Sequence, residues 1–473
     1  MSVFAMTARR VVQASHRQVL LLTNSGALAA TGVATAALGF MFWWFAARYF
    51  PPHAVGLAAA AISIMNLVGL IGEFGLGTLL MGESLRRGRE APGLISAALF
   101  AALASSALFG VACLVLAGLS PLKLGSFLSS TDYSLLFIAG CAVTGFMLVL
   151  DGALVGLLQS ALRMYRNVTF SVLKLALLPT LAFAIPAGPQ EITIFLAWVL
   201  GTLLSVLLLV PLLAYRGHAV WSRPNFATLQ RQRPSVLRHH LLDLVTQGPG
   251  LILPFLVTVI FAADVNAAFY SAWMILNVIV LVPASLTTML FTMGAAQPTE
   301  LATRMRFSLW LCVVASLVAC AGTYFLSGWV LGWFGPSYAA TGAPILQILG
   351  LGVFAIALKQ HYIAVQRLKG RMVHAAALLG AGGIIELVLA TYGARWGGFS
   401  GFAWGWLCAI YLEAMFVAPA VLRAAWRDRV FDVCDAAPCH APSIRLDQSR
   451  RPARSAYVPQ ATRVRTLILR RRR

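Results

Sequence analysis

The sequence has 473 residues, of which 60% are hydrophobic and only 11% are charged, with a mean hydropathy of +0.82. A soluble domain carries about 25% charged residues, so this chain lacks the charge that a soluble surface needs and is expected to lie mostly in lipid. The charges that it has are unbalanced, because 36 Lys and Arg face 15 Asp and Glu and leave a net charge of +21. A bundle of membrane helices exposes little surface to water, so the location of this excess is informative.

Twelve nearly uncharged runs are long enough to cross a bilayer, for which a helix needs roughly 20 apolar residues. The sequence therefore predicts an all-α polytopic membrane protein with spans at 22–47, 54–81, 93–119, 134–160, 167–187, 192–214, 241–263, 267–294, 307–334, 343–366, 373–394 and 398–422. The seventh run contains Gly248, Pro249, Gly250 and Pro254, which predict a broken helix that could act as a hinge or gate. A packed kink is the alternative.

The basic residues gather in every second loop, as the positive-inside rule describes for cytoplasmic loops. Only Arg48, Lys123 and Arg395 fall in the predicted outer loops, whereas the inner loops and the C-terminal tail are rich in arginine. Both termini are therefore predicted to be cytoplasmic. The expected order is a cytoplasmic N-terminal segment, a six-helix N-lobe, a basic cytoplasmic linker, a six-helix C-lobe and a basic tail, at residues 1–21, 22–214, 215–240, 241–422 and 423–473.

The tail ends in four arginines, from Arg470 to Arg473, and is expected to be disordered and to bind anionic membrane lipids rather than nucleic acid. The seven cysteines show no paired pattern, and Cys434, Cys439 and His440 lack a fourth metal ligand, so we expect neither a disulfide framework nor a metal site. The sequence contains no phosphate-binding Gly-rich motif and predicts no cofactor. The short outer loops leave no room for an external catalytic domain, which disfavours a membrane glycosyltransferase or polymerase.

The two halves show weak internal symmetry about the linker. A shift of 211 positions superimposes the end of the first run and most of the second on the matching part of the second half, through the identities Phe50/Phe261, Ala61/Ala272, Ile64/Ile275 and Asn66/Asn277. Such symmetry is typical of transporters built from two repeated bundles. Chance similarity between two apolar helices is the alternative interpretation.

Three stretches resemble a known family. The segment from Ala46 to Leu57, with Arg48 before an aromatic residue and two prolines, resembles the first external turn of bacterial polysaccharide exporters, including O-antigen flippases. The Glu-Phe-Gly-Leu-Gly sequence at 73–77 is similar to the acidic-x-Gly-Leu-Gly signature that closes the second helix of that family. The basic Gly-Arg loop at 365–372 is similar to the loop that follows its tenth helix. The Pro-Pro-His sequence at 51–53 departs from the family, which more often has one proline and an acidic residue.

The resemblance implies membership of the multidrug/oligosaccharidyl-lipid/polysaccharide (MOP) superfamily, with two six-helix lobes around a central cavity. It implies a non-enzymatic flippase in the bacterial inner membrane that moves polyprenyl-pyrophosphate-linked oligosaccharide, a repeat unit of O-antigen, capsule or exopolysaccharide, to the outer leaflet. Polysaccharide polymerases or glycosyltransferases are the expected protein partners. A cation-coupled multidrug exporter of the same superfamily, and a non-transporting component of a polysaccharide assembly complex, remain alternatives.

Ionisable residues inside the predicted spans are costly in lipid and are expected to face the protein interior or a partner. They are Glu73, Asp151 and Lys174 in the first half and Lys359, Glu386 and Glu413 in the second. Asp151 and Lys174 each lie eight residues from the same inner loop, which places both about 12 Å from the inner boundary at the rise of a helix. They could therefore form a structural ion pair between consecutive helices, or Lys174 could bind cargo.

Cationic side chains in the cavity suit a pyrophosphate-linked cargo, because an ammonium is a compact partner for phosphate. The candidate substrate-binding residues are Arg48, Lys174 and Lys359, with attachment to lipid headgroups as the alternative role of Arg48. Uphill transport without a nucleotide needs coupling to an ion gradient, and a buried carboxylate can supply it. Asp151, Glu386 and Glu73 are the candidates for coupling. Trp43 and Trp44 are expected to lie in the interfacial aromatic belt, with sugar stacking as the alternative.

Overall fold

Helices account for every regular element in the residues that the computed structural model describes, which are 32–426 except 33, 88–89, 120–126, 128, 187, 216–221, 232 and 297–300. The helical structure follows from the sequence, because a backbone in lipid must satisfy its hydrogen bonds within its own segment. Within these residues nine helices are long and apolar enough to cross a membrane, and α13 and α14, bent by 45°, pass the same test together. The chain is a multi-pass membrane protein.

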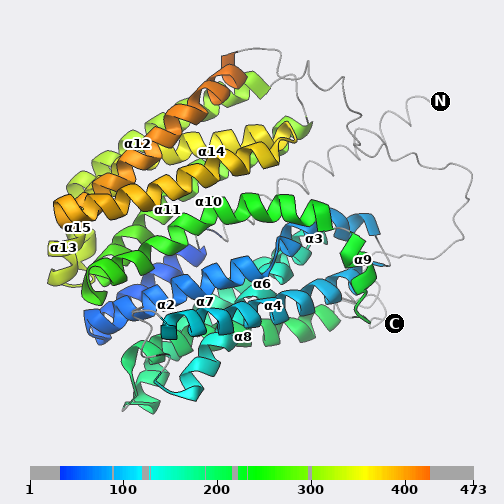
Figure 1. Ribbon diagram of the computed structural model, residues 1–473, viewed down its shortest axis with the longest axis horizontal. Helices are drawn as coiled ribbons and strands as arrows, with labels where there is room; N and C mark the ends of the chain where they lie inside the picture. The colour runs from blue at the N-terminus through cyan, green and yellow to red at the C-terminus, as the bar shows by residue number, and fades with distance from the viewer. Residues whose placement is uncertain are drawn as a thin grey trace, which may run out of the picture. The chain divides into compact units, whose positions relative to one another are not determined.

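The first part of the chain, residues 32–215, is called the N-half. Its helical residues 34–49 are followed by α2 (Pro52–Gly72), α3 (Leu76–Arg87), α4 (Ala91–Leu119), α6 (Thr131–Gly156), α7 (Ser160–Ala184) and α8 (Gln190–Tyr215). Residues 233–426 are the C-half. It contains α10 (Arg233–Ile260), α11 (Ala263–Ala296), α12 (Leu301–Gly332), α13 (Pro336–Leu351), α14 (Val353–Leu368) and α15 (Met372–Trp426), and the short α9 (Phe226–Arg231) precedes it (Figure 1).

The second predicted span, 54–81, is two helices rather than one. The helix α2 ends at Gly72, and α3 begins at Leu76 after a break in which Phe74 and Gly75 have φ angles of 49° and 72°. Gly75 is suited to this left-handed conformation because it has no side chain. A Cβ atom at this position would also lie 2.8 Å from the backbone nitrogen of His240, so the break brings α3 and α10 into close contact.

The prediction of a broken seventh helix is wrong, because α10 runs without interruption from Arg233 to Ile260 through both prolines. A proline removes one backbone donor, and packing against neighbouring helices makes that loss tolerable in a membrane bundle. Pro249 packs against α15, where a Cβ atom added to Gly383 would lie 2.6 Å from its Cγ. This contact agrees with the packed alternative and leaves no unwound segment at Gly248 or Gly250.

The last two predicted spans form a helical hairpin within α15. The two arms meet at Gly397 and Gly398, whose backbone angles are not helical. Close contacts between residues on opposite arms show that the arms run antiparallel: a Cβ on Gly393 would lie 2.1 Å from the carbonyl oxygen of Gly401, and a Cβ on Gly405 would lie 2.0 Å from that of Leu389. The arms can approach each other this closely only because Gly393 and Gly405 have no side chain, as at many close helix contacts in membranes.

The N-half and the C-half are in direct contact through α2, which packs against α10 and α11. A Cβ added to Gly56 on α2 would overlap the backbone of Ala263 on α11, and the side-chain amide of Asn266 donates a 2.8 Å hydrogen bond to the carbonyl oxygen of Gly56. The two helices begin at Pro52 and Ala263, 211 positions apart, which is the shift found in the sequence. In the same way α7 and α15 begin 212 positions apart, at Ser160 and Met372.

The helices alternate in direction, so their connections collect at two ends of the bundle. One end, called the basic end, carries the described arginines and lysine of the connections and helix ends, namely Arg87, Arg163, Arg166, Arg223, Arg231, Arg304, Arg306, Arg367, Lys369, Arg371 and Arg423. The opposite end carries Arg48 and Arg395. Partial loss of solvent, together with the charges of Arg371 and Arg423, lowers the pKa of the exposed Lys369, as expected where cations are crowded. The N-terminal segment, residues 216–221 and 232 of the linker, and the basic tail from residue 427 lie outside the described residues.

The hairpin generates a test of the fold. We expect Gly405→Ala to lower the midpoint of thermal unfolding of the detergent-solubilised protein, because overpacking of this kind costs about 1–3 kcal/mol. Gly322→Ala in α12 is the matched control, since a Cβ atom there meets nothing within 4 Å. An Ala in a helix is favoured over Gly by about 0.5–1 kcal/mol, so the control should unfold at the same or a higher temperature. Equal effects of the two substitutions would contradict the hairpin.

Candidate functional site

A cluster of one lysine and two glutamates lies inside the C-half. The ammonium of Lys359 on α14 lies 2.9 Å from Oε1 of Glu386 and 2.8 Å from Oε2 of Glu413, which stand on opposite arms of α15. The indole Nε1 of Trp406 donates a 3.2 Å hydrogen bond to the other oxygen of Glu386. We call Lys359, Glu386 and Glu413 the charge triad. The sequence named Glu386 and Glu413 as the acids near Lys359, and the structure brings all three together.

The triad is buried, with side-chain exposures of 14% for Lys359, 6% for Glu386 and 2% for Glu413. Its formal charge is −1, because one ammonium faces two carboxylates. Oε1 of Glu413 is buried and accepts no hydrogen bond from the described residues. The hairpin positions these groups: Gly382 leaves space for Glu413, since a Cβ there would lie 2.5 Å from Cδ of that glutamate.

Lys174 on α7 is the second intramembrane cation, and aromatic rings surround it. Its ammonium lies 3.8 Å from the ring centroid of Trp198, 4.6 Å from that of Phe170 and 5.1 Å from that of Phe42. The residue is 4% exposed and forms no hydrogen bond or ion pair with any described residue. Aromatic faces attract a cation, by about 2 kcal/mol or more when water is excluded, but they leave its positive charge uncompensated.

The predicted ion pair between Asp151 and Lys174 is wrong. Asp151 on α6 is instead bound by Arg166, whose Nε and Nη2 donate 2.8 Å hydrogen bonds to its two oxygens, and Nε of Arg163 lies 3.4 Å from Oδ2. The bidentate pair is favoured because the guanidinium matches the carboxylate in shape. Arg166 was assigned to a basic inner loop, but it is fully buried in the first turns of α7. Asp151 therefore takes part in a structural link between α6 and α7.

Glu73 and Arg48 lie at opposite ends of the bundle. Glu73 follows α2 and accepts a 3.3 Å hydrogen bond from the backbone N–H of Gly77. Arg48 is exposed, and its Nε donates a 2.8 Å hydrogen bond to the carbonyl oxygen of Trp333, which also accepts a 2.9 Å bond from Nε1 of Trp44. These two bonds attach the first helical segment to the end of α12.

Two groups of aromatic side chains, together called the aromatic row, lie beside Lys174 and the charge triad. In the first group, Trp198 lies 6.1 Å from Trp43, which lies 4.6 Å from Tyr270 on α11. The second group is Phe269, Trp273 and Trp406, with centroid distances of 5.8 Å and 5.4 Å between successive rings, and Phe269 precedes Tyr270 in the chain. Trp43 is 3% exposed. Trp43 therefore lies inside the protein, whereas its neighbour Trp44 is more exposed, at 36%; their place in an interfacial belt stays a prediction.

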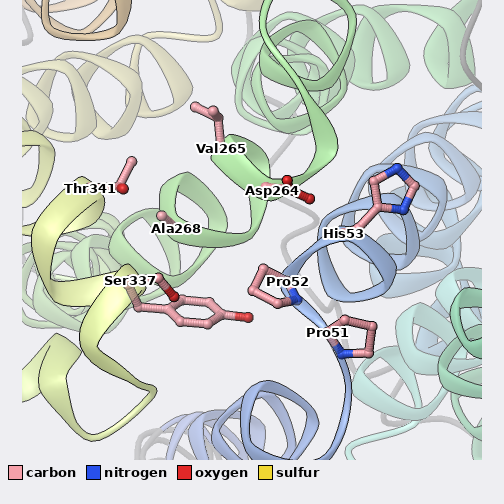
Figure 2. A pocket seen from close by; sticks show the side chains of 9 residues that line it. Pro51, Pro52, His53, Asp264, Val265, Ala268, Ser337 and Thr341 are labelled. Carbon is pink, nitrogen blue, oxygen red and sulfur yellow. The ribbon is translucent and has the colours of Figure 1, made fainter.

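A pocket of about 370 Å³ opens at the opposite end between three helix N-termini. Figure 2 shows Pro51, Pro52 and His53 at the start of α2, Asp264, Val265 and Ala268 on α11, and Ser337 and Thr341 on α13 around it. The Pro-Pro-His sequence that departs from the polysaccharide-exporter pattern thus lines this pocket. Tyr338 also contributes to the lining, and its buried hydroxyl has no hydrogen-bond partner in the described part of the chain.

A polar contact near the basic end was missed by the sequence analysis. Asp243 on α10 accepts a 2.8 Å hydrogen bond from the hydroxyl of Thr78 on α3, and Nη2 of Arg367 on α14 lies 3.6 Å from its other oxygen. The carboxylate therefore links the N-half to two helices of the C-half. The isolated acid near the start of an apolar run was the available signal. Together with the Asn266 contact, it closes the interface of the halves near both ends.

The pairing of Asp151 can be tested by substitution. We expect Arg166→Met to lower the yield of folded protein and its unfolding temperature strongly, since breaking a buried ion pair costs about 3–5 kcal/mol. Arg163→Met is the matched control, because its side chain is 34% exposed and such pairs contribute about 0–1 kcal/mol. The double variant Asp151→Asn with Arg166→Met should recover stability in thermal unfolding. A failure of Arg166→Met to destabilise the protein more than Arg163→Met would rule out this role.

No protein-family model and no curated protein matches the chain. Among solved structures, it is similar to an inward-facing multidrug resistance MATE family transporter of the MOP superfamily, with a TM-score of 0.61 and 16% identity over 82% of this chain and 94% of that one. It is also similar to a mutant of the Vibrio cholerae MATE transporter VcmN, with a TM-score of 0.61 and 15% identity over 88% of this chain and 98% of that one. The lipid II flippase MurJ in an inward closed conformation is similar with a TM-score of 0.59 and 13% identity over 86% of this chain and 90% of that one. The chain has the fold of the MOP superfamily transporters.

Proposed function

We propose that this protein is a flippase that moves a polyprenyl-pyrophosphate-linked oligosaccharide from the inner to the outer leaflet of a bacterial cytoplasmic membrane. The cargo is a repeat unit of O-antigen, capsule or exopolysaccharide, and transport is by alternating access coupled to an ion gradient. The MOP fold supports a transporter, and the similarity to a lipid II flippase supports a lipid-linked cargo. The protein is on this proposal a carrier and not an enzyme.

The topology of the proposal is twelve spans in two repeats. The count of twelve treats α2 with α3 as one span, α13 with α14 as one span and the two arms of α15 as two spans. The segment 34–49 and the remaining long helices supply the others. The offsets of 211 and 212 positions between α2 and α11, and between α7 and α15, support an N-lobe and a C-lobe of equivalent helices. The positive-inside rule makes the basic end cytoplasmic, together with both termini.

The observation that carries the proposal is the uncompensated ammonium of Lys174. A cation inside a membrane protein without a carboxylate partner is expensive and is retained where it serves function. The ammonium of Lys174 lies over the rings of Phe42, Phe170 and Trp198. An anionic group that enters beside these rings would supply the missing counter-charge, and a pyrophosphate is such a group.

The row of aromatic rings fits the other part of the cargo. Several of its rings, including Trp198, Tyr270 and Trp273, are only half-buried, so they offer apolar faces next to polar edges. Rings of this kind combine a large apolar surface with a hydrogen-bonding group, which suits the mixed surface of a sugar. On this proposal the pyrophosphate pairs with Lys174 and the glycan extends along the row toward Lys359. Arg48 at the opposite end receives the cargo as it leaves.

A multidrug exporter is the second candidate, and the charge triad favours it. A net charge of −1 beside aromatic rings could bind an organic cation through charge and cation–π attraction. An assay in vesicles separates the two functions, because a fluorescent cationic dye and a fluorescent polyprenyl-pyrophosphate oligosaccharide can be offered to the same preparation. Transport of the dye alone would overturn the flippase proposal. Transfer of neither substrate by correctly inserted protein would support a non-transporting role.

The role of Lys174 is tested in the same vesicles. We expect Lys174→Met to reduce oligosaccharide transfer roughly 10- to 100-fold, since a charge-assisted contact contributes about 1.5–3 kcal/mol. Lys174→Arg should retain part of the activity. The unfolding temperature of Lys174→Met should not fall, because the substitution removes a buried charge without a carboxylate partner.

Lys369→Met is the control for this prediction, because Lys369 is exposed at the basic end and belongs to no buried cluster. It should transfer the oligosaccharide at the wild-type rate. Full activity of Lys174→Met, or a matching loss in Lys369→Met, would contradict the assigned role of Lys174.

A further inference from the structure

We propose that Glu413 binds an exchangeable proton and that the charge triad couples cargo binding to proton uptake. The proton site follows from the geometry of Lys359, Glu386 and Glu413 alone. The coupling to cargo rests on the proposed function. Glu413 was not among the coupling candidates Asp151, Glu386 and Glu73 that the sequence suggested.

The charge balance of the triad requires a proton. One ammonium lies within 2.9 Å of two carboxylates that are 6% and 2% exposed, and this leaves one negative charge without a partner. The cost of burying an unpaired ion is several kcal/mol in real proteins. Protonation of one carboxylate brings the formal charge of the cluster to zero, and a buried group adopts its neutral form under such conditions.

The hydrogen bonds identify which carboxylate takes the proton. Both oxygens of Glu386 accept a hydrogen bond, one from Lys359 and one from Trp406. Only Oε2 of Glu413 accepts one, from Lys359, and Oε1 is buried with no partner among the described residues. Hydrogen bonds to the ionised form of a carboxylate stabilise that form, and Glu413 has fewer of them than Glu386, so the proton is assigned to Glu413.

No other charged group faces Glu413 from the described helices that pack against it. From α10, Val245 and Pro249 contact the glycines of α15, and from α11, Trp273 contacts Trp406. His361 lies on α14 two positions from Lys359, but its ring bonds Ser308 on α12 and the carbonyl oxygen of Ala357. Tyr411 on the same arm of α15 donates to the carbonyl oxygen of Leu351. The protonation of Glu413 therefore depends on Lys359 and Glu386.

A metal cation does not fit the triad as well as a proton does. A hard cation needs several oxygen ligands at once, whereas the ammonium of Lys359 already occupies the space between the two carboxylates. The described residues contain no group of three or more His, Cys, Asp or Glu side chains that could hold a metal ion. The ammonium of Lys359 thus occupies the position that a metal cation would need. The ion that the triad can bind is therefore a proton.

Protonation changes how firmly Lys359 is held. A carboxylate at Glu413 competes with any other anion for the ammonium, and the protonated acid competes far less. When a hydronium ion donates a proton to Glu413, one O–H bond of the hydronium breaks and releases water, one O–H bond forms on the carboxyl group, and Lys359 keeps Glu386 as its one anionic partner. Lys359 can then bind the glycan end of the cargo. Because coupling between two ligands is reciprocal, cargo bound at Lys359 also raises the affinity of Glu413 for the proton.

Infrared spectroscopy of the purified full-length protein tests the proton site without any cargo. We expect a carbonyl band of a protonated carboxylic acid at neutral pH that is lost in Glu413→Gln and retained in Glu83→Gln. Glu83 is a suitable control because it is paired with Arg87 near the basic end. Lys359→Met should increase the band, since two carboxylates without a cation both bind protons. A band that persists in Glu413→Gln would overturn the assignment, and thermal unfolding confirms that each variant is folded.

The coupling is tested separately by following a pH indicator while polyprenyl-pyrophosphate oligosaccharide is added to the detergent-solubilised protein. Wild type should take up protons on binding and Glu413→Gln should not. Binding of the oligosaccharide without proton uptake by the wild type would overturn the coupling. Loss of the infrared band in Glu413→Gln, together with no binding or transfer of the oligosaccharide by the wild type, would instead leave the proton site standing and reject the proposed function.

Discussion

Close approach of helix backbones at glycine is the constraint on which the arrangement of charges depends. A Cβ atom at Gly56 would overlap α11, and one at Gly393 or Gly405 would overlap the facing arm of the hairpin. In lipid, apolar side chains gain little by leaving the solvent, so packing at short range provides much of the association between helices. The narrow hairpin brings Glu386 and Glu413 within reach of one lysine, although they are 27 positions apart in the sequence. The polar chemistry of the C-half is thus a product of its apolar packing.

The three intramembrane sites differ in how their charges are compensated. Asp151 has a surplus of cations, since Arg166 and Arg163 both contact it, and this fits a fixed link between α6 and α7. The charge triad has one carboxylate more than its single ammonium can neutralise, and Lys174 has no carboxylate partner among the described residues. A balanced or overcompensated pair has no need of a further ligand. The charge triad can accept a proton and Lys174 can accept an anion. The aromatic row lies between these two sites.

The sequence predicted what depends on local composition and failed where contacts between helices decide. Hydropathy and the alternation of arginine located the helical runs, and the weak repeat reappears as the equal spacing of helix starts. The break between α2 and α3 was missed because composition predicts one span at 54–81, whereas the positive φ of Gly75 and the nearby His240 backbone show a turn. The proline-rich α10 stays helical because α15 covers it. The prediction that Lys174 pairs with Asp151 was wrong because the depth of a residue along a helix does not specify which face of the helix its side chain occupies. For the same reason the sequence did not reveal the contacts of Asp243.

The positions of two buried charges along their helices have a consequence for the field inside the protein. Lys174 lies 14 positions after the start of α7, and Glu386 lies 14 positions after the start of α15. One place carries a cation and the other an anion. The two helices therefore carry opposite charge at the same position along their length, and the potential inside the protein differs from one half to the other. An elongated ligand with a charged head and a neutral body would be aligned by this potential before it contacted any residue specifically.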